Sequence, residues 1–345
     1  MIEVEPGIHI YRLQLPFPDS TLDYVNAYLV EGDRDNGHLL IDTGWDTKEA
    51  FDSLKKQLVE IGINLEDISQ IVVTHVHPDH YGLAGKLKRL YNAKLALHHL
   101  EKDFIESRYI NMDKLLQQME HLLQANGTPP DELTKLQTAS LPMIRFVTPV
   151  LPDVTLYGGE TITTGYFSFK VLPTPGHASG HICLYEPGRK ILFSGDHVLP
   201  TITPHVGLHP QSGSNPLGDY IDSLNGLKQL DVKLVLPGHE QPFTTFKPRL
   251  KEIIQHHQHR NREILSALKA SPKTAYQTAT EITWMHDVKG VGWDKLGPWD
   301  KRMAVLETLS HLEAMKIMGK LEKTTRDNII YYSKPGPGKT NEPAR

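Results

Sequence analysis

The sequence predicts an α/β protein with two sets of strands, each accompanied by helices, and a smaller helical region towards its C-terminal end. Short apolar runs rich in β-branched residues recur in two blocks, over about 7–99 and 154–239, and each run has strand length. Helical patterns lie between these runs, and from residue 246 onward the pattern is mainly helical. The blocks therefore predict two similar βα halves whose sheets pack together with helices outside.

The first block alternates strands and helices. Its early runs, bounded by Gly, Pro or Asp, predict strands over 7–15, 25–32 and 37–44. A helix is predicted over 47–62, beginning at Thr47, whose hydroxyl is suited to cap a helix N-terminus. Beyond it we predict a strand, a helix and a strand over 68–75, 82–92 and 94–99. The block therefore ends in a β-α-β-α-β unit.

The strand pattern stops between residues 100 and 150. Within this segment, leucines and a methionine recur at helical spacing over 113–127. We therefore predict a helical insertion over 100–150. Such an insertion acts either as a lid over a site or as a plain structural support.

The remaining elements divide the chain into domains. The second block contains a hairpin turn at Pro187-Gly188 and a helix over 217–230. After it we predict helices over 249–270, 274–284 and 300–319, then a two-stranded hairpin over 320–334. Three helices followed by a hairpin are the order of a winged helix. The predicted parts are an α/β domain over 1–245, a winged-helix-like domain over 246–335 and a disordered tail over 336–345.

Composition indicates a globular protein of the cytoplasm. The chain is 39% hydrophobic and 23% charged, which is ordinary. It has no run of about 18 apolar residues, so no membrane span is expected. Its first residues lack the basic and apolar segments of a signal peptide. The single cysteine, Cys183, excludes an internal disulfide and suggests a reducing compartment.

Charge is distributed unevenly along the chain. Residues 246–345 contain 18 Lys and Arg against 11 Asp and Glu, although the whole chain has a net charge of -4. A basic C-terminal part on an acidic body is a mild signal for nucleic-acid binding. A basic surface that only faces solvent is the simpler explanation.

Metal-binding residue types are concentrated directly after a predicted strand. His75, His77, Asp79 and His80 lie within six positions. If the chain stays extended, the two first histidines share one face, and Pro78 then turns the chain so that the later residues reach a second position. Two ligand sets a few ångströms apart are the arrangement of a two-metal site. Imidazole and carboxylate suit Zn²⁺ best, with Mn²⁺, Fe²⁺ and Co²⁺ as alternatives.

Three later residues have the same character. His177, Asp196 and His239 each follow an apolar strand and a glycine, which lets the backbone turn tightly. We expect these residues to converge on the first cluster.

These motifs resemble the binuclear hydrolases of the metallo-β-lactamase superfamily, over about residues 5–245. The resemblance rests on HVHPDH at 75–80 and on the later PGH, SGD and PGH motifs that end at His177, Asp196 and His239. It implies an αββα sandwich with the site at the sheet edge. It implies one metal on His75, His77 and His177, a second on Asp79, His80 and His239, and Asp196 as a bridge. Asp42 resembles the family's carboxylate that orients a liganding imidazole.

The resemblance implies a hydrolase with two Zn²⁺ ions per chain, whose bridging hydroxide attacks a small ester, thioester or lactone. Asp79 is expected to orient this hydroxide or to return a proton to the leaving group. His77 stands where flavodiiron relatives carry Glu, which favours hydrolysis over oxygen chemistry. Substrate contacts are predicted for His98, His99 and Tyr81.

Two other functions stay open. Some relatives with a C-terminal winged helix are endoribonucleases, and the basic C-terminal part is consistent with an RNA partner. Winged helices also mediate dimerisation, so an alternative role for this domain is to hold the chains of a homo-oligomer together. A purely structural metal protein is disfavoured because both metal positions keep an open ligand set.

Overall fold

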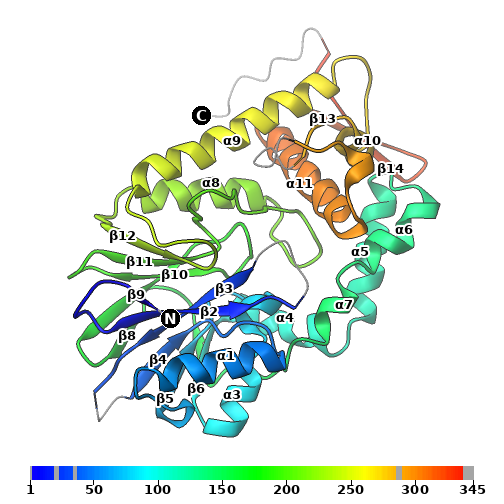
Figure 1. The fold of residues 1–345 in the computed structure, drawn as a ribbon. Coiled ribbons are helices and arrows are strands. Elements are labelled where there is room, and N and C mark those ends of the chain that lie inside the picture. Colours follow the sequence, from blue (N-terminus) through cyan, green and yellow to red (C-terminus); the bar gives the residue numbers. More distant parts are fainter. Residues whose placement is uncertain (1, 19–22, 34–36, 285–289, 337–345) are drawn as a thin grey trace. The chain divides into compact units, whose positions relative to one another are not determined.

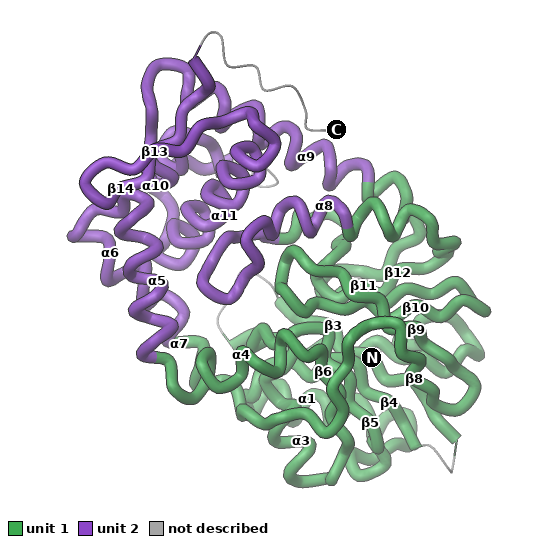
Figure 2. The backbone as a smooth tube through the Cα atoms, turned by 180° about the vertical axis from the view of Figure 1, so that it is seen from behind, with its two compact units in different colours: residues 1–112, 142–204, 223–250 green, residues 113–141, 205–222, 251–345 purple. Residues whose placement is uncertain are grey.

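The structure, a computed structural model, describes residues 2–18, 23–33, 37–284 and 290–336 (Figure 1). Its chain divides into two compact units (Figure 2). Unit 1 comprises residues 1–112, 142–204 and 223–250, and unit 2 comprises 113–141, 205–222 and 251–345. Within the described part, we find no helix that is both long enough and apolar enough to cross a membrane.

Unit 1 contains two sheets, of which the first has seven strands in the order β1-β2-β3-β4-β5-β6-β7. These strands are Ile2–Glu3, Ile10–Pro16, Tyr24–Val30, His38–Ile41, Ile68–Val72, Lys94–His98 and Val154–Leu156. The strands from β1 to β4 pair antiparallel, and those from β4 to β7 pair parallel. The parallel part contains the predicted β-α-β-α-β order.

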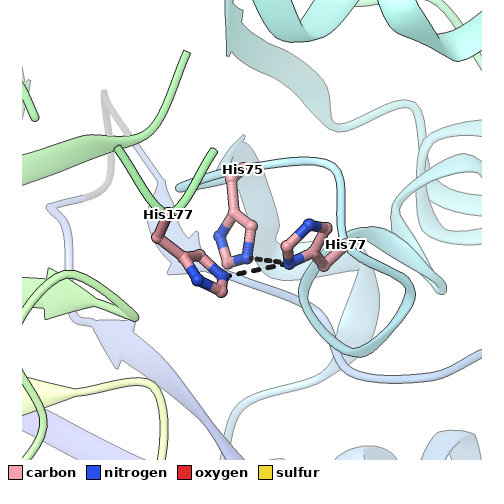
Figure 3. A group of neighbouring side chains, drawn as sticks. All are labelled: His75, His77 and His177. Atoms are coloured by element: carbon pink, nitrogen blue, oxygen red, sulfur yellow. Dashed lines mark hydrogen bonds between the residues drawn. The ribbon is translucent and has the colours of Figure 1, made fainter. Parts of the chain in front are cut away.

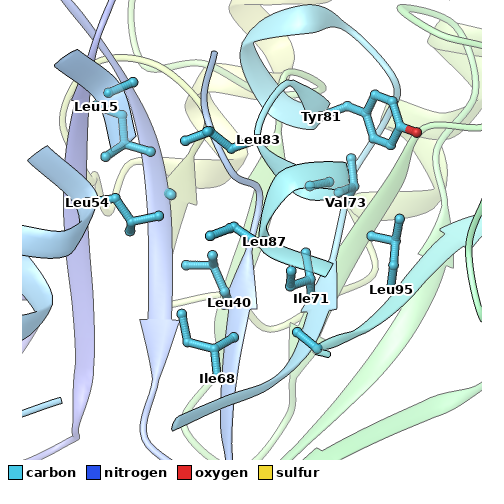
Figure 4. Packing of buried hydrophobic residues seen from close by; sticks show 14 of the residues in the cluster. Leu15, Leu40, Leu54, Ile68, Ile71, Val73, Tyr81, Leu83, Leu87 and Leu95 are labelled. Atoms are coloured by element: carbon cyan, nitrogen blue, oxygen red, sulfur yellow. The ribbon is translucent and has the colours of Figure 1, made fainter. Parts of the chain in front are cut away.

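Helices cover the outer face of this first sheet. They are α1 (Lys48–Val59) and α3 (Ala84–Tyr91), with a short 3-10 turn, η1, at Leu65–Asp67. Apolar side chains of the sheet, such as Leu40 and Ile71, pack with Leu54 of α1 and Leu87 of α3 in one cluster (Figure 4). This cluster fixes the ends of the parallel strands, where the predicted site residues lie.

The second sheet of unit 1 has five strands in the order β12-β11-β10-β9-β8. Its strands β8 to β12 are Thr161–Thr164, Phe167–Pro173, Ile182–Glu186, Ile191–Gly195 and Leu234–Pro237. The antiparallel pairing of β10 with β11 confirms the predicted hairpin at Pro187-Gly188. Within this second sheet, β11 pairs parallel with β12, and the other neighbouring strands pair antiparallel.

The two sheets pack face to face through a shared apolar layer. Tyr28 and Val72 of the first sheet belong to the same buried cluster as Phe169 and Phe193 of the second. The rings of Tyr28 and Phe193 lie 5.2 Å apart, edge to face. Unit 1 is therefore a sandwich of two sheets, as predicted.

The segment predicted as an insertion is helical. It forms α4 (His99–Tyr109), α5 (Asp113–Ala125), α6 (Pro130–Gln137) and α7 (Leu141–Ile144). The sequence analysis placed the whole segment in the first domain, whereas the structure divides it between the two units. Residues 113–141 belong to unit 2, because Met119 and Leu123 of α5 and Leu136 of α6 are buried in its core.

Unit 2 also contains the C-terminal elements. They are α10 (Ala275–Thr280), the turn η3 (Trp293–Lys295), α11 (Pro298–Ile317) and the hairpin β13 (Glu322–Arg326) with β14 (Ile329–Ser333). Two more helices, α8 (Pro216–Leu227) and α9 (Phe246–Ala267), begin in one unit and end in the other. Helices followed by a hairpin agree with the predicted order, while the winged-helix interpretation stays a prediction. The predicted tail beyond Gly336 lies outside the described residues.

Candidate metal centre

The first cluster of predicted ligands lies where β5 gives way to a short helix. His77 is the N-cap of helix α2 (Pro78–Tyr81), and Pro78 is its first residue. Proline suits this position because its fixed φ is helical and its missing N–H would have no helical partner. The turn predicted at Pro78 is thus the start of a helix, and Asp79 and His80 lie in its first turn.

Three histidines converge from two loops and form the three-histidine group: His75, His77 and His177 (Figure 3). The Nε2 atom of His75 lies 2.9 Å from Nδ1 of His77. The Nε2 atom of His177 lies 3.1 Å from that same Nδ1. One nitrogen of each ring therefore points to a common position, which is what a metal ion with imidazole ligands requires.

Four further residues form the mixed group: Asp79, His80, Asp196 and His239. The Nε2 atom of His239 lies 3.3 Å from Oδ2 of both Asp79 and Asp196. The Nε2 atom of His80 lies 3.3 Å from Oδ1 of Asp196. This group combines two carboxylates with two imidazoles, a donor set that suits a divalent metal.

Asp196 connects the two groups. Its Oδ2 atom lies 3.3 Å from His239 in the mixed group and 3.7 Å from Nε2 of His177 in the three-histidine group. The rings of His75 and His80, one from each group, are 4.3 Å apart between centroids. Asp196 therefore lies between the two groups, and the metal-bridging role that the resemblance implied for it stays a prediction.

Asp42 orients one histidine of each group. Its Oδ2 atom accepts a hydrogen bond from Nδ1 of His80 at 2.8 Å and from the Thr74 hydroxyl at 3.0 Å. Because that hydroxyl donates to Asp42, it accepts from Nδ1 of His75, 3.0 Å away. Both rings consequently turn Nε2 towards the ligand groups. This is the orienting role predicted for Asp42.

The charges in the centre call for a cation. Burial alone would lower the pKa of His80 and His239, but the nearby Asp196 and Asp79 carboxylates raise it, to about 10 for His239. Burial lowers the pKa of His75 well below its usual value, and the neighbouring histidines lower it further. The Nε2 of His80 and Oδ1 of Asp196 are buried and face each other at 3.3 Å without forming a well-aligned hydrogen bond. A metal ion would satisfy both atoms, so these residues fit the expected cofactor.

The loop that carries His239 is held by residues the sequence analysis did not identify. The side-chain amide of Asn26 donates to the carbonyls of Pro237 and Glu240 at 2.9 and 2.8 Å. The Tyr28 hydroxyl donates to the same Pro237 carbonyl at 2.8 Å. Asn26 is a fully buried polar residue inside an apolar strand, and that interruption of the strand pattern was its only sequence signal.

The predicted substrate residues His98 and His99 lie outside both groups. His98 ends β6, and His99 begins α4, with their rings 4.4 Å apart. Burial lowers the pKa of His98, and His99 lowers it further. The ring of His99 stacks on Tyr157. A substrate contact through either histidine stays a prediction.

Tyr81 has a structural position rather than the predicted one at the substrate. Its ring is fully buried in the core beneath the first sheet. Its hydroxyl donates to the carbonyl of Val150 and accepts from the N–H of the same residue. The phenol is therefore occupied by backbone and ties α2 to the segment that follows α7.

A hollow of about 580 Å³ in unit 1 has none of the predicted ligands among the described residues of its lining. It is lined in part by Phe17, Lys48, Arg145 and Phe146. The Phe17 ring lies 5.9 Å from the ring of His239. The Arg145 guanidinium lies over the Phe146 ring at 4.5 Å. The lining also contains the carboxylates of Asp46 and Glu49, so the hollow is mixed in charge.

Comparison with known proteins supports a metal centre at the two ligand groups. The family model described as the metallo-beta-lactamase superfamily matches residues 20–239. The Bacillus subtilis (strain 168) protein named "Probable metallo-hydrolase YqjP" is 28% identical over 94% of this chain and 97% of its own length. The Homo sapiens protein named "Acyl-coenzyme A thioesterase MBLAC2" is 29% identical over 70% of this chain and 80% of its own length.

A solved structure is similar over nearly the whole chain. It is the crystal structure of a metallo-beta-lactamase family protein from Thermus thermophilus. The TM-score is 0.79 at 30% sequence identity, and the similarity covers 95% of this chain and 99% of that one. The chain therefore belongs to the metallo-beta-lactamase superfamily and is a metallo-hydrolase.

Proposed function

We propose that the chain hydrolyses a small ester, thioester or lactone with two Zn²⁺ ions, and that a thioester is the first substrate to test. The observation that carries the proposal is the pair of ligand groups that share Asp196. The thioester preference draws on the human relative, which is named an acyl-coenzyme A thioesterase. Mn²⁺ and Fe²⁺ are alternative metals for the same donors.

The roles of the residues follow from their donors. His75, His77 and His177 would hold one ion and Asp79, His80 and His239 the other, with Asp196 shared. When bound, the ions supply a hydroxide near neutral pH and stabilise negative charge on the attacked carbonyl group. Asp79 lies in the first turn of α2 and is only partly buried. We assign it the role of holding the proton that returns to the leaving group.

The proposal is tested with a substrate panel on the zinc-loaded full chain. The panel contains an acyl-coenzyme A, the matching acyl-N-acetylcysteamine thioester, a lactone, a nitrophenyl ester and single-stranded RNA. We expect turnover of a thioester, its loss in chelator and in His77→Ala, and its retention in His121→Ala, which changes an exposed histidine on α5. Absence of turnover of all three carboxylic classes by fully loaded protein would refute the proposal.

The RNA arm of the panel addresses the second candidate function. The observation that favours it is the positive surplus of residues 246–345. Metal-dependent cutting of RNA that His77→Ala abolishes would replace the ester proposal with a nuclease. RNA binding should then weaken steeply with salt, because phosphate contacts release counterions.

A further inference from the structure

We propose that helix α4 positions the three-histidine group, and that Glu101 and Tyr109, here called the α4 pair, are the positioning residues. The inference rests on the proposed binuclear centre and adds to it a support that acts on one metal position. The pair touches neither group through a ligand atom. It acts through the backbone of the two loops that carry His75, His77 and His177.

The first loop is held at Val76, the residue between His75 and His77. The N–H of Val76 donates to Oε2 of Glu101 at 2.9 Å. The carbonyl of Val76 accepts a hydrogen bond from the Tyr109 hydroxyl. Both polar backbone groups of Val76 are thus bound to α4, so the peptide planes on either side of it are fixed. The directions in which the two histidine side chains leave the backbone are fixed with them.

The second loop is held at Gly180, three residues after His177. Its N–H donates to Oε1 of Glu101 at 2.8 Å. A Cβ atom at position 180 would lie 2.7 Å from Cγ of Glu101 and 3.0 Å from its backbone nitrogen. The loop can therefore approach α4 this closely only with glycine at this position. One carboxylate, which is 1% exposed, joins the two loops.

The mixed group has different supports. His80 is oriented by Asp42, and the loop of His239 is held by Asn26 and Tyr28. Neither of these supports involves α4. A change in the α4 pair should therefore weaken one metal position and spare the other.

Glu101→Gln is the sharpest variant. The carboxylate offers only acceptors, and each of its oxygens faces a backbone N–H. The amide of glutamine places an NH₂ group against one of these two donors, at almost unchanged volume. Because removing such supporting bonds typically costs about 10–100-fold in metal affinity, we expect that loss for one zinc equivalent and less than about threefold for the other.

The test is a zinc titration of the metal-free full chain against a competing chelating dye, which reports two affinities without any substrate. Asp103→Asn, on the exposed face of the same helix, is the matched control and should leave both affinities unchanged. Tyr109→Phe removes one hydroxyl and should weaken the same equivalent to a smaller extent. If Glu101→Gln does not fold, Tyr109→Phe alone decides the question.

A double variant identifies which position is affected. His177→Asn removes a ligand of the three-histidine group, so adding Glu101→Gln to it should lower the remaining affinity no further. Equal loss of both equivalents, or unchanged affinities, in Glu101→Gln and Tyr109→Phe would overturn the inference. Loss of one equivalent in a protein that cleaves no ester or thioester would leave the inference standing and refute the proposed function instead.

Discussion

At the residue scale, the centre depends on positions where no side chain fits. A Cβ atom at Gly238 would lie 2.5 Å from Oδ1 of Asp196 and 2.6 Å from Cε1 of His80. Both atoms belong to the mixed group, so neither can move without changing the donor geometry. Glycine at position 238 therefore leaves these two residues the room that any side chain would take.

We predict that Gly238→Ala weakens zinc binding at the mixed group and destabilises the metal-free protein by about 1–3 kcal/mol, the usual cost of overpacking. The control is Gly226→Ala, because an added Cβ at Gly226 of α8 meets nothing within 4 Å. In a helix this change should be stabilising by roughly 0.5–1 kcal/mol. Urea unfolding and zinc titration measure both effects. Full retention of two zinc equivalents in Gly238→Ala would contradict the prediction.

The sequence was informative about the ligands but, apart from Asp42, gave no signal of the residues that support them. His75 to His80 stand in one short segment after a strand, and Asp196 and His239 follow strands of their own, so local pattern predicted their convergence. Asn26 holds the loop of His239 through Pro237, which is 211 positions away in the chain. A partner at that distance leaves no local pattern. For the same reason Tyr81, a neighbour of the ligands in sequence, was wrongly expected to face the substrate.

At the element scale, strand and helix ends were predictable where a side chain marks them. Thr47 was expected to cap α1, and its hydroxyl accepts a hydrogen bond from the Ala50 N–H at 3.0 Å. The helix predicted over 82–92 is present as α3, while the separate short helix α2 before it was not predicted. Pro78 starts α2 early because proline favours the first helical position. From the sequence we predicted only that Pro78 turns the chain, and not that it begins a helix.

Removing the α1 cap should destabilise unit 1. Thr47→Ala leaves the Ala50 N–H without its partner, and we expect a loss of about 1 kcal/mol in the free energy of unfolding. Thr47→Ser keeps a hydroxyl at the cap and should restore most of the loss. Urea unfolding of metal-free protein measures the difference. Equal stability of the alanine and parent proteins would show that the cap contributes nothing.

At the scale of the whole molecule, unit 2 contains a buried pair of histidines. The Nδ1 of His257 lies 3.3 Å from Nε2 of His311, whose Nδ1 lies 2.8 Å from the side-chain oxygen of Asn261. Burial, together with the neighbouring His256 and Arg260, lowers the pKa of His257 to about 3. Burial also lowers the pKa of His311 well below its usual value.

These shifts predict acid sensitivity. Between pH 6.5 and about 3 the unfolded chain binds a proton at His257 and the folded chain does not. Stability therefore falls as the pH is lowered through this window, by about 1.4 kcal/mol per pH unit for each such histidine. In metal-free protein, kept so by a chelator, His257→Asn should reduce the slope of the free energy of unfolding against pH by the amount that one proton contributes, about 1.4 kcal/mol per pH unit. His259→Asn, at an exposed position, should not. Identical slopes in all three proteins would argue against the prediction.

The division into two units was not predictable from the order of elements. Local pattern placed 113–141 within an insertion of the first domain, whereas α5 and α6 bury their leucines in the core of unit 2. The guanidinium of Arg302 in α11 reaches the carbonyl of Leu136, 166 positions earlier in the chain. Hydrophobic periodicity shows that a helix has an apolar face. It does not show which distant helix covers that face.

This separation has a consequence for synthesis. Helices α5 and α6 leave the ribosome long before α11, which buries Leu306 and Leu309 in the same core. Until then their apolar faces lack much of this core, and exposed surface of this kind promotes aggregation of nascent chains. The core of unit 2, which also takes Tyr332 from β14, is then expected to close after the metal-binding loops are complete.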